Sequence, residues 1–420
     1  PYFESEMKRA IATYEKKYRM KLEHPVMVEV YPNHDDFAVR TLGMPGLGAL
    51  GVTFGYSIAM DSPSGRKPGS FHWASTLWHE MSHVFTLTAT NHKVPRWFTE
   101  GMAVHEETAA SPEWGDRLGP DVLMAIKEKQ LLPVAELDRG FVHPKAAAQV
   151  LVSYYQAGRI CDYINDKWGW DTLLGMLHDF GEGMDTPSVI RKELKSEPEE
   201  FDKQFFATVE TENKKTIDGF EEWKKTLKLI SEAAREKDWD KVIARGTQIR
   251  DLYPDYVEAG SVYEFLANAY IAKGDKPAAM AELGRYMKIG GREPEPIKQY
   301  AKLLEEAGKK KDAAAALDRL NLIYPIDNDL HQRLGSIWLD EGNAPGAVRE
   351  FNALVSHKPI DPAQAHFELA RAYQMAHQVD KAKDEVLAAL ETAPGYKPAQ
   401  KLLLELNTEG SGTPAAPIKK

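Results

Sequence analysis

A repeat in the second half of the chain constrains its fold more than any other feature. Three copies begin 34 residues apart, at 266–283, 300–317 and 334–351. A fourth copy, at 369–386, is displaced by 35 residues, and a weaker one surrounds 235–249. Each copy has the pattern of two helices joined by a turn, and such a pair can bury its apolar face only by stacking on its neighbours. The repeat therefore predicts an all-α solenoid over 223–406.

The period resembles that of tetratricopeptide repeats, as does the order Leu-Ala or Leu-Gly, then a bulky residue, then Gly and Ala. The resemblance implies a concave surface that binds peptides or proteins, so we expect a protein partner on the solenoid. A coincidental helical bundle is the alternative, and four copies in near-constant register oppose it. The final segment, 407–420, is poor in bulky apolar residues and is predicted to be a disordered tail.

Composition and charge limit which classes of protein the chain can belong to. The 420 residues, 43% of them hydrophobic and 28% charged, exceed what one core needs, so at least two domains are expected. A net charge of -10 works against nucleic acid as the main partner. No apolar stretch reaches the roughly 20 residues of a membrane-spanning helix. The single cysteine, Cys161, excludes an intrachain disulfide, and its apolar surroundings predict a core residue rather than a nucleophile.

The first half of the chain mixes strand and helix patterns. Residues 26–31 and 50–60 are predicted to be strands, and 33–41 a short helix. Apolar residues at helical spacing predict a helix from Phe71 to about Thr90, and another helix is expected over 146–168.

The long helix from Phe71 carries the motif HEMSH. With 3.6 residues per turn, His79 and His83 project from nearly the same face, one turn apart, as two ligands of one metal must. Glu80 is rotated by about 100° and can take a proton from a metal-bound water without being a ligand. A chance match is the alternative. The bulky apolar neighbours favour a buried helix, in which unpaired His and Glu would be costly.

A third ligand is needed for a catalytic zinc, and Glu100 is the candidate. It lies in PRWFTEG, on a helix that we expect to start at Pro95 and to form a hairpin with the motif helix. The same segment contains His105, Glu106 and Glu107. We expect the two glutamates on a solvated face and His105 outside the ligand set, because three protein ligands satisfy such a site.

The pair HEMSH and PRWFTEG resembles the gluzincin branch of zinc metallopeptidases, specifically small bacterial peptidase MA-like domains, over about 1–210. The resemblance implies an α+β zincin-like fold and one zinc ion per chain. By the same match, His79, His83 and Glu100 are the metal ligands and Glu80 is the general base.

The resemblance also implies an edge strand that binds extended substrate, in the place of residues 50–60. This segment lacks the acidic residue that anchors a free amine in related aminopeptidases, which favours an endopeptidase. The family also places a donor near the metal to stabilise the oxyanion. On the helix at 153–164, Tyr154 falls on the usual tyrosine, with Tyr155 and His143 as alternatives.

These observations predict a metallopeptidase domain at 1–210, a helical connector at 211–222, the repeat solenoid at 223–406 and the tail at 407–420. The expected function is zinc-dependent hydrolysis of a protein or peptide. The alternative is a catalytically silent or autoinhibited scaffold that acts through its repeats. The chain starts without an initiator methionine or a signal-peptide pattern, so we expect a preceding segment and favour an extracytoplasmic over a cytoplasmic location.

Overall fold

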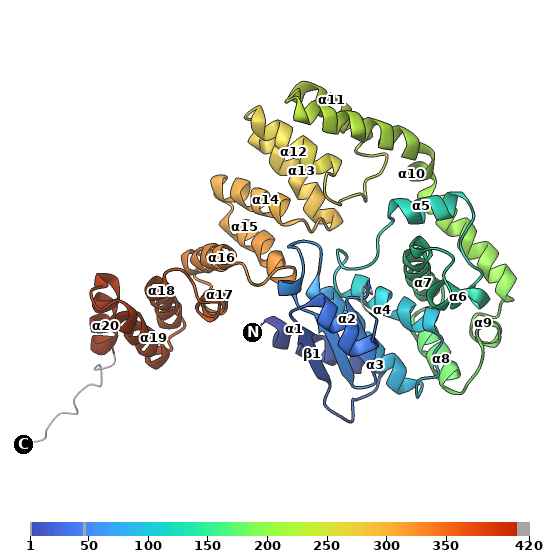
Figure 1. The fold of residues 1–420 in the computed structure, drawn as a ribbon, viewed down its shortest axis with the longest axis horizontal. Helices are drawn as coiled ribbons and strands as arrows, with labels where there is room; N and C mark the ends of the chain where they lie inside the picture. Colours follow the sequence, from blue (N-terminus) through green and yellow to red (C-terminus); the bar gives the residue numbers. More distant parts are fainter. Residues whose placement is uncertain (1, 45–47, 410–420) are drawn as a thin grey trace, which may run out of the picture. The chain divides into compact units, whose positions relative to one another are not determined.

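The computed structural model describes residues 2–44 and 48–409, which fall into two compact units, 2–297 and 298–409. The chain is predominantly helical, with one small sheet near its start (Figure 1). None of the helices described is long and apolar enough to cross a membrane. The last helix, α20 (Lys397–Glu409), extends into the predicted tail, and the rest of that tail lies outside the described residues.

The sheet contains three strands in the order β1-β3-β2. β1 (Met27–Tyr31) pairs in parallel with β3 (Ser57–Asp61), and β2 (Gly51–Phe54) pairs with β3 in antiparallel fashion. The prediction of a single strand over 50–60 is therefore wrong. Gly55, at φ +60°, permits a tight turn that folds this segment into a hairpin.

One helix lies at the centre of the first unit. α3 (Trp73–Ala89) is buried over most of its circumference and packs against α1 (Tyr2–Tyr18), α4 (Arg96–Ala110) and the β2-β3 hairpin. The short α2 (His34–Leu42) packs on β1 and β3. The bounds of α2, α3 and α4 agree with the sequence-based expectation to within a few residues.

Between α4 and the repeats, this unit contains α5 (Pro120–Lys127), α6 (Arg139–Val142), α7 (Ala147–Trp168), α8 (Trp170–Gly181) and α9 (Thr186–Leu194). α7 crosses α4 closely at two glycines. A Cβ on Gly101 would lie 2.5 Å from the carbonyl oxygen of Ala157, and one on Gly158 would lie 2.5 Å from Val104. Cys161 is buried at the same crossing, which confirms it as a core residue.

A single long helix, α10 (Pro198–Arg235), leads into the repeats. Near its start, Phe205 packs on Tyr163 of α7, with ring centroids 5.8 Å apart. Near its end, Trp223 packs on Tyr253 at 4.9 Å. The predicted boundaries at 210 and 222 thus fall within one unbroken helix, and their exact positions stay a prediction.

The repeats are antiparallel helix pairs, as their period predicted. After α11 (Trp239–Ile249), the helices are α12 (Val262–Ala272), α13 (Lys276–Ile289), α14 (Pro294–Glu306), α15 (Lys310–Asp318), α16 (Asn328–Asp340), α17 (Ala344–Ser356), α18 (Pro362–Met375) and α19 (Val379–Thr392). The turn inside each pair has one residue in the left-handed region. These residues are Lys237, Gly274, Gly308, Gly342 and His377. The shared left-handed residue shows that the turns of the copies have a similar backbone conformation.

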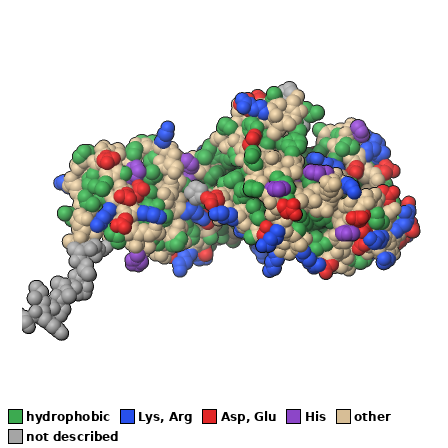
Figure 2. Space-filling view, turned by 90° about the horizontal axis from the view of Figure 1, so that it is seen from below, with side chains coloured by type: hydrophobic (Ala, Val, Ile, Leu, Met, Phe, Trp, Pro, Cys, Tyr) green, Lys and Arg blue, Asp and Glu red, His purple; other side chains and the backbone are tan. Residues whose placement is uncertain are grey.

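The surface carries both signs of charge. On the face shown in Figure 2, acidic and basic side chains are interspersed with apolar ones. Large apolar side chains that are exposed include Met27 and Val30 on β1 and Phe54 on β2.

Candidate metal centre

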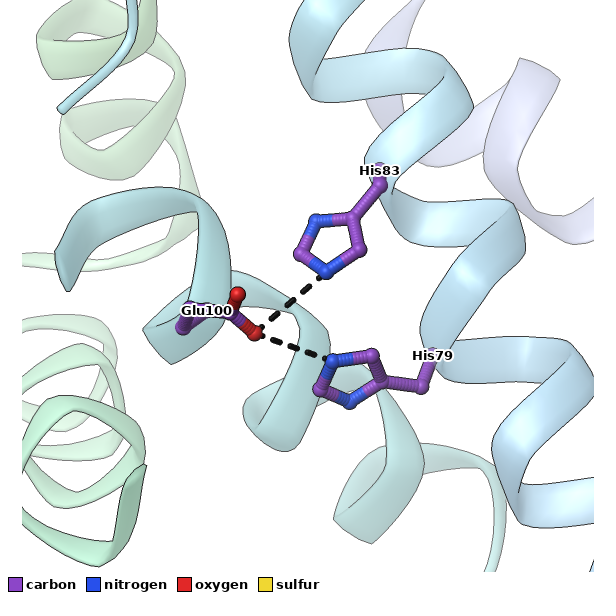
Figure 3. Close-up of side chains that lie close together, drawn as sticks. All are labelled: His79, His83 and Glu100. Atoms are coloured by element: carbon purple, nitrogen blue, oxygen red, sulfur yellow. Dashed lines mark hydrogen bonds and ion pairs between the residues drawn. The ribbon is translucent and has the colours of Figure 1, made fainter. Parts of the chain in front are cut away.

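Three side chains meet where α3 and α4 form a hairpin (Figure 3). Asn91 and His92, both at positive φ, reverse the chain between the two helices. Nε2 of His79 lies 3.0 Å and Nε2 of His83 lies 3.3 Å from the same atom, Oε2 of Glu100. One donor atom from each residue lies within 4.8 Å of the other two. The structure thus brings together the three residues predicted as ligands.

The three side chains could hold a metal ion such as zinc. Tetrahedral ligands at about 2.0–2.1 Å from zinc are separated from one another by about 3.3–3.4 Å, close to the two distances to Glu100. Two imidazoles and one carboxylate form a donor set found in catalytic zinc sites, where three protein ligands leave a fourth position open. Glu100 is fully buried, so the surrounding protein restricts the orientation of its carboxylate.

Both histidines are oriented through their other ring nitrogen. Nδ1 of His79 donates to Oε1 of Glu107 at 2.6 Å, and Nδ1 of His83 is hydrogen-bonded to Oγ1 of Thr99 at 2.8 Å. The Thr99 hydroxyl is itself hydrogen-bonded to Thr86 at 2.7 Å. A proton on Nδ1 leaves the Nε2 lone pair for a metal, and such outer partners fix the ring orientation.

The expectation of a solvated face for Glu106 and Glu107 is wrong. Glu107 turns inward to His79, and Glu106 is buried, with its Oε2 2.5 Å from Nζ of Lys17. Glu107 is seven residues after Glu100 and therefore on the same face of α4, a signal that the sequence contained. His105 instead pairs with Asp162 at 2.7 Å, on the α7 side.

Charges in the centre reinforce one another. Burial alone would raise the pKa of Glu100, but the adjacent His83 and His79 hold it well below its usual range. Burial opposes protonation of His79, yet its hydrogen bonds to Glu100 and Glu107 hold its pKa well above its usual value. Nη2 of Arg96 lies 2.6 Å from Oε1 of Glu100, the oxygen that faces away from the histidines.

Glu80 lies on the side of α3 that faces the sheet. Its Oε2 accepts a hydrogen bond of 2.6 Å from the hydroxyl of Thr53 on β2. A Cβ on Gly51 would lie 2.7 Å from both Cγ and Oε1 of Glu80, so the glycine leaves the space that this side chain occupies. The predicted base therefore lies between the motif helix and the edge strand β2.

The structure separates the three candidates for the oxyanion donor. The ring of Tyr154 lies 6.2 Å from that of His79, and its hydroxyl is hydrogen-bonded to Arg96. Burial and the charge of Glu100 raise the Tyr154 pKa, so the hydroxyl keeps its proton. Tyr155 turns towards Arg159 and α10, and burial raises its pKa to about 12. His143 is exposed at the end of α6.

One charged residue near the site was not anticipated from the sequence. Asp116 lies in the loop between α4 and α5, with its side chain reaching solvent. The loop thus adds an exposed acidic side chain whose charge acts on Glu107 and His79.

Comparisons with known proteins found one family model and several solved structures that are similar to parts of the chain. Residues 7–205 match the family model of the peptidase MA superfamily. No curated protein sequence matches the chain.

Several solved structures resemble part of the chain, and some of them are described as TPR proteins. YrrB, described as a TPR protein with an unusual peptide-binding site, is 16% identical and aligns over 42% of this chain and 89% of its own, with a TM-score of 0.33. MamA from Desulfovibrio magneticus RS-1 is 21% identical over 36% of this chain and 84% of its own, with a TM-score of 0.30. A thermophilic TPR protein from Thermus thermophilus is 15% identical over 44% of this chain and 99% of its own, with a TM-score of 0.24.

Proposed function

Because residues 7–205 match the peptidase MA superfamily, we propose that the chain is a zinc-dependent peptidase of the gluzincin type. The observation that carries the proposal is the convergence of Nε2 of His79 and Nε2 of His83 on Oε2 of Glu100. We propose a zincin-like fold for this domain, since its motif helix, ligand helix and antiparallel edge strand have the expected order.

The residues around the centre supply the groups that peptide hydrolysis requires. A bound zinc ion would supply a Lewis acid for the scissile carbonyl and for water. Glu80 accepts the proton of the attacking water and passes it to the nitrogen of the breaking C–N bond. Tyr154, which keeps its proton, donates a hydrogen bond to the oxygen that becomes negatively charged.

The edge strand supports an extended substrate. β2 has a pairing partner only on its β3 side within the described sheet, so its other edge can pair with a peptide beside Glu80. β2 is Gly51–Phe54 and contains no acidic residue that would bind a free amine. We therefore propose endopeptidase activity on a protein or peptide, with the repeats as the surface for substrate or partner.

The first test is metal content. We expect about one zinc per chain in the purified protein, measured by elemental analysis, and loss of the metal in His83→Ala. His178→Ala is the matched control, because His178 is exposed on α8. Absence of zinc after mild purification and after zinc addition would instead favour a scaffold that acts through its repeats.

The second test separates binding from chemistry. Glu80→Gln should retain zinc but lose hydrolysis of an unstructured protein such as casein, because the amide cannot accept the water's proton. Equal activity in Glu80→Gln and wild type would contradict the assigned role of Glu80.

A further inference from the structure

A loop of the first unit connects the metal centre with the repeats. It comprises residues 111–119, between α4 and α5, and is called the 111–119 loop below. On one side it contacts the motif helix: the indole of Trp114 packs on Trp78, the neighbour of His79, with ring centroids 5.9 Å apart. The hydroxyl of Ser75 shares its hydrogen between the carbonyl oxygen of Trp114, at 3.3 Å, and the carboxylate of Glu107.

On its other side the 111–119 loop is bound by the repeats. Nη1 of Arg117 donates to the carbonyl oxygen of Ile289 at 2.9 Å, and Nη2 donates to that of Gly290. These carbonyls lie at the end of α13, where a helix leaves acceptors unsatisfied and carries partial negative charge. The hydroxyl of Tyr253 donates to the carbonyl oxygen of Leu118.

The contact requires a close backbone approach. Gly290 is at φ +93°, and a Cβ there would lie 2.5 Å from Cβ of Glu113. Any other residue would be strained at this φ and would also separate α13 from the loop. The loop and this end of α13 belong to the same compact unit, 2–297.

A continuous series of contacts therefore runs from the repeats to a proposed metal ligand. Arg117 and Tyr253 hold the 111–119 loop, the loop holds the Trp114 carbonyl against Ser75, and Ser75 donates to the Glu107 carboxylate that accepts from His79. Metal ligands must be held within a fraction of an ångström, so the groups that orient them affect metal affinity.

We propose that the repeats as far as the end of α13 are a structural part of the metal centre. In this proposal Arg117 and Tyr253 are positioning residues for His79, and they act through the 111–119 loop and Glu107. This inference rests on the proposed function, because it concerns the affinity of the same site for zinc. Neither residue touches the metal ligands themselves.

The test compares zinc affinity in full-length variants by competition with a chromophoric chelator. Tyr253→Phe removes only the hydroxyl that reaches Leu118 and keeps the ring that packs on Trp223. We expect Arg117→Ala combined with Tyr253→Phe to bind zinc about tenfold more weakly, the low end of the range for groups that orient ligands. The control combines Tyr263→Phe, whose hydroxyl donates within the repeats to Pro254 at 2.9 Å, with the exposed Arg235→Ala.

A double-mutant cycle distinguishes positioning from a general loss of stability. If Arg117 and Tyr253 act through Glu107, their effect on the zinc dissociation constant should shrink when Glu107→Gln is already present. The melting temperature of the zinc-free proteins is recorded in parallel, and Tyr253→Phe alone serves if the double variant fails to fold.

Zinc binding should also stabilise the contact in return, since coupling between two sites is reciprocal. Hydrogen exchange of peptides covering 111–119 and 284–292 should slow when zinc is added. Equal zinc affinity in wild type and the Tyr253→Phe variants, with exchange unaffected by zinc, would overturn the inference and leave the proposed function intact. A wild-type protein that binds no zinc would overturn both.

Discussion

The carboxylate of Glu107 accepts a hydrogen bond of 2.6 Å from Nδ1 of His79, while Nε2 of the same ring faces Glu100 at 3.0 Å. We predict that Glu107→Gln weakens zinc binding by about 10- to 100-fold, because the ring loses a charged partner that fixes its orientation. Chelator competition measures the change. Glu106→Gln, one residue earlier and directed to Lys17, should leave the affinity unchanged.

The substitution Gly51→Ala should reduce the rate of hydrolysis and leave zinc binding unchanged. The new methyl group would lie 2.7 Å from Cγ of Glu80 and must displace this side chain. A displacement of about 1 Å in a catalytic group can cost about 100-fold in rate, so we expect a loss of about 10- to 100-fold in kcat. Gly48→Ala is the control, since nothing lies within 4 Å of its added Cβ. Normal casein hydrolysis by Gly51→Ala would contradict the placement of Glu80 against β2.

Gly101→Ala tests the crossing of α4 and α7. Its Cβ would lie 2.5 Å from the carbonyl oxygen of Ala157 and 2.8 Å from Sγ of Cys161, and neither group can move freely. Overpacking of this kind costs about 1–3 kcal/mol, and calorimetry should show a lower melting temperature. Gly175→Ala, on α8, would have the flexible carboxylate of Glu193 as its nearest contact and should cause no such loss.

Asp202→Asn should change the pH dependence of stability. Burial raises the pKa of Asp202 from 3.8 to about 6, although the amide of Val134 donates to it at 3.0 Å. The folded protein thus binds this proton more tightly than the unfolded chain, and the residue's contribution to stability falls as pH rises from about 4 to 6. At pH 7 and above, the variant should be more stable than wild type by at most about 3 kcal/mol.

Melting curves of both proteins from pH 4 to 8 measure this difference. It should be smallest near pH 4, where the carboxyl group of Asp202 in the folded protein is protonated, and a difference that does not vary with pH would contradict the assigned pKa.

The grouping of His79, His83 and Glu100 could be predicted because helix geometry relates these residues directly. The turn of one helix fixes His79 relative to His83, and the short loop before Pro95 limits where Glu100 can lie. The repeats could also be predicted from the sequence, because a constant period remains detectable when residues at single positions vary. The hairpin of β2 and β3 was missed because the tight turn at Gly55 lies within an otherwise apolar segment.

Other features depend on residues that are remote in sequence. Glu106 was expected to be solvated because its partner, Lys17, is 89 positions away on α1. The contact between Arg117 and the end of α13 spans 172 residues. Neither pairing produces a periodic pattern in the sequence, so both pairings become evident only in the folded structure.

The 38 residues of α10 also affect how such a protein can evolve. A recombination event that exchanged the repeats for another array would have to join two sequences inside this helix and preserve its phase. One residue inserted before Trp223 would turn everything after it by about 100° and move it by about 1.5 Å, which would take Tyr253 away from Leu118. Insertions that survive in α10 should therefore be rare, and the two halves should be inherited as a single cassette.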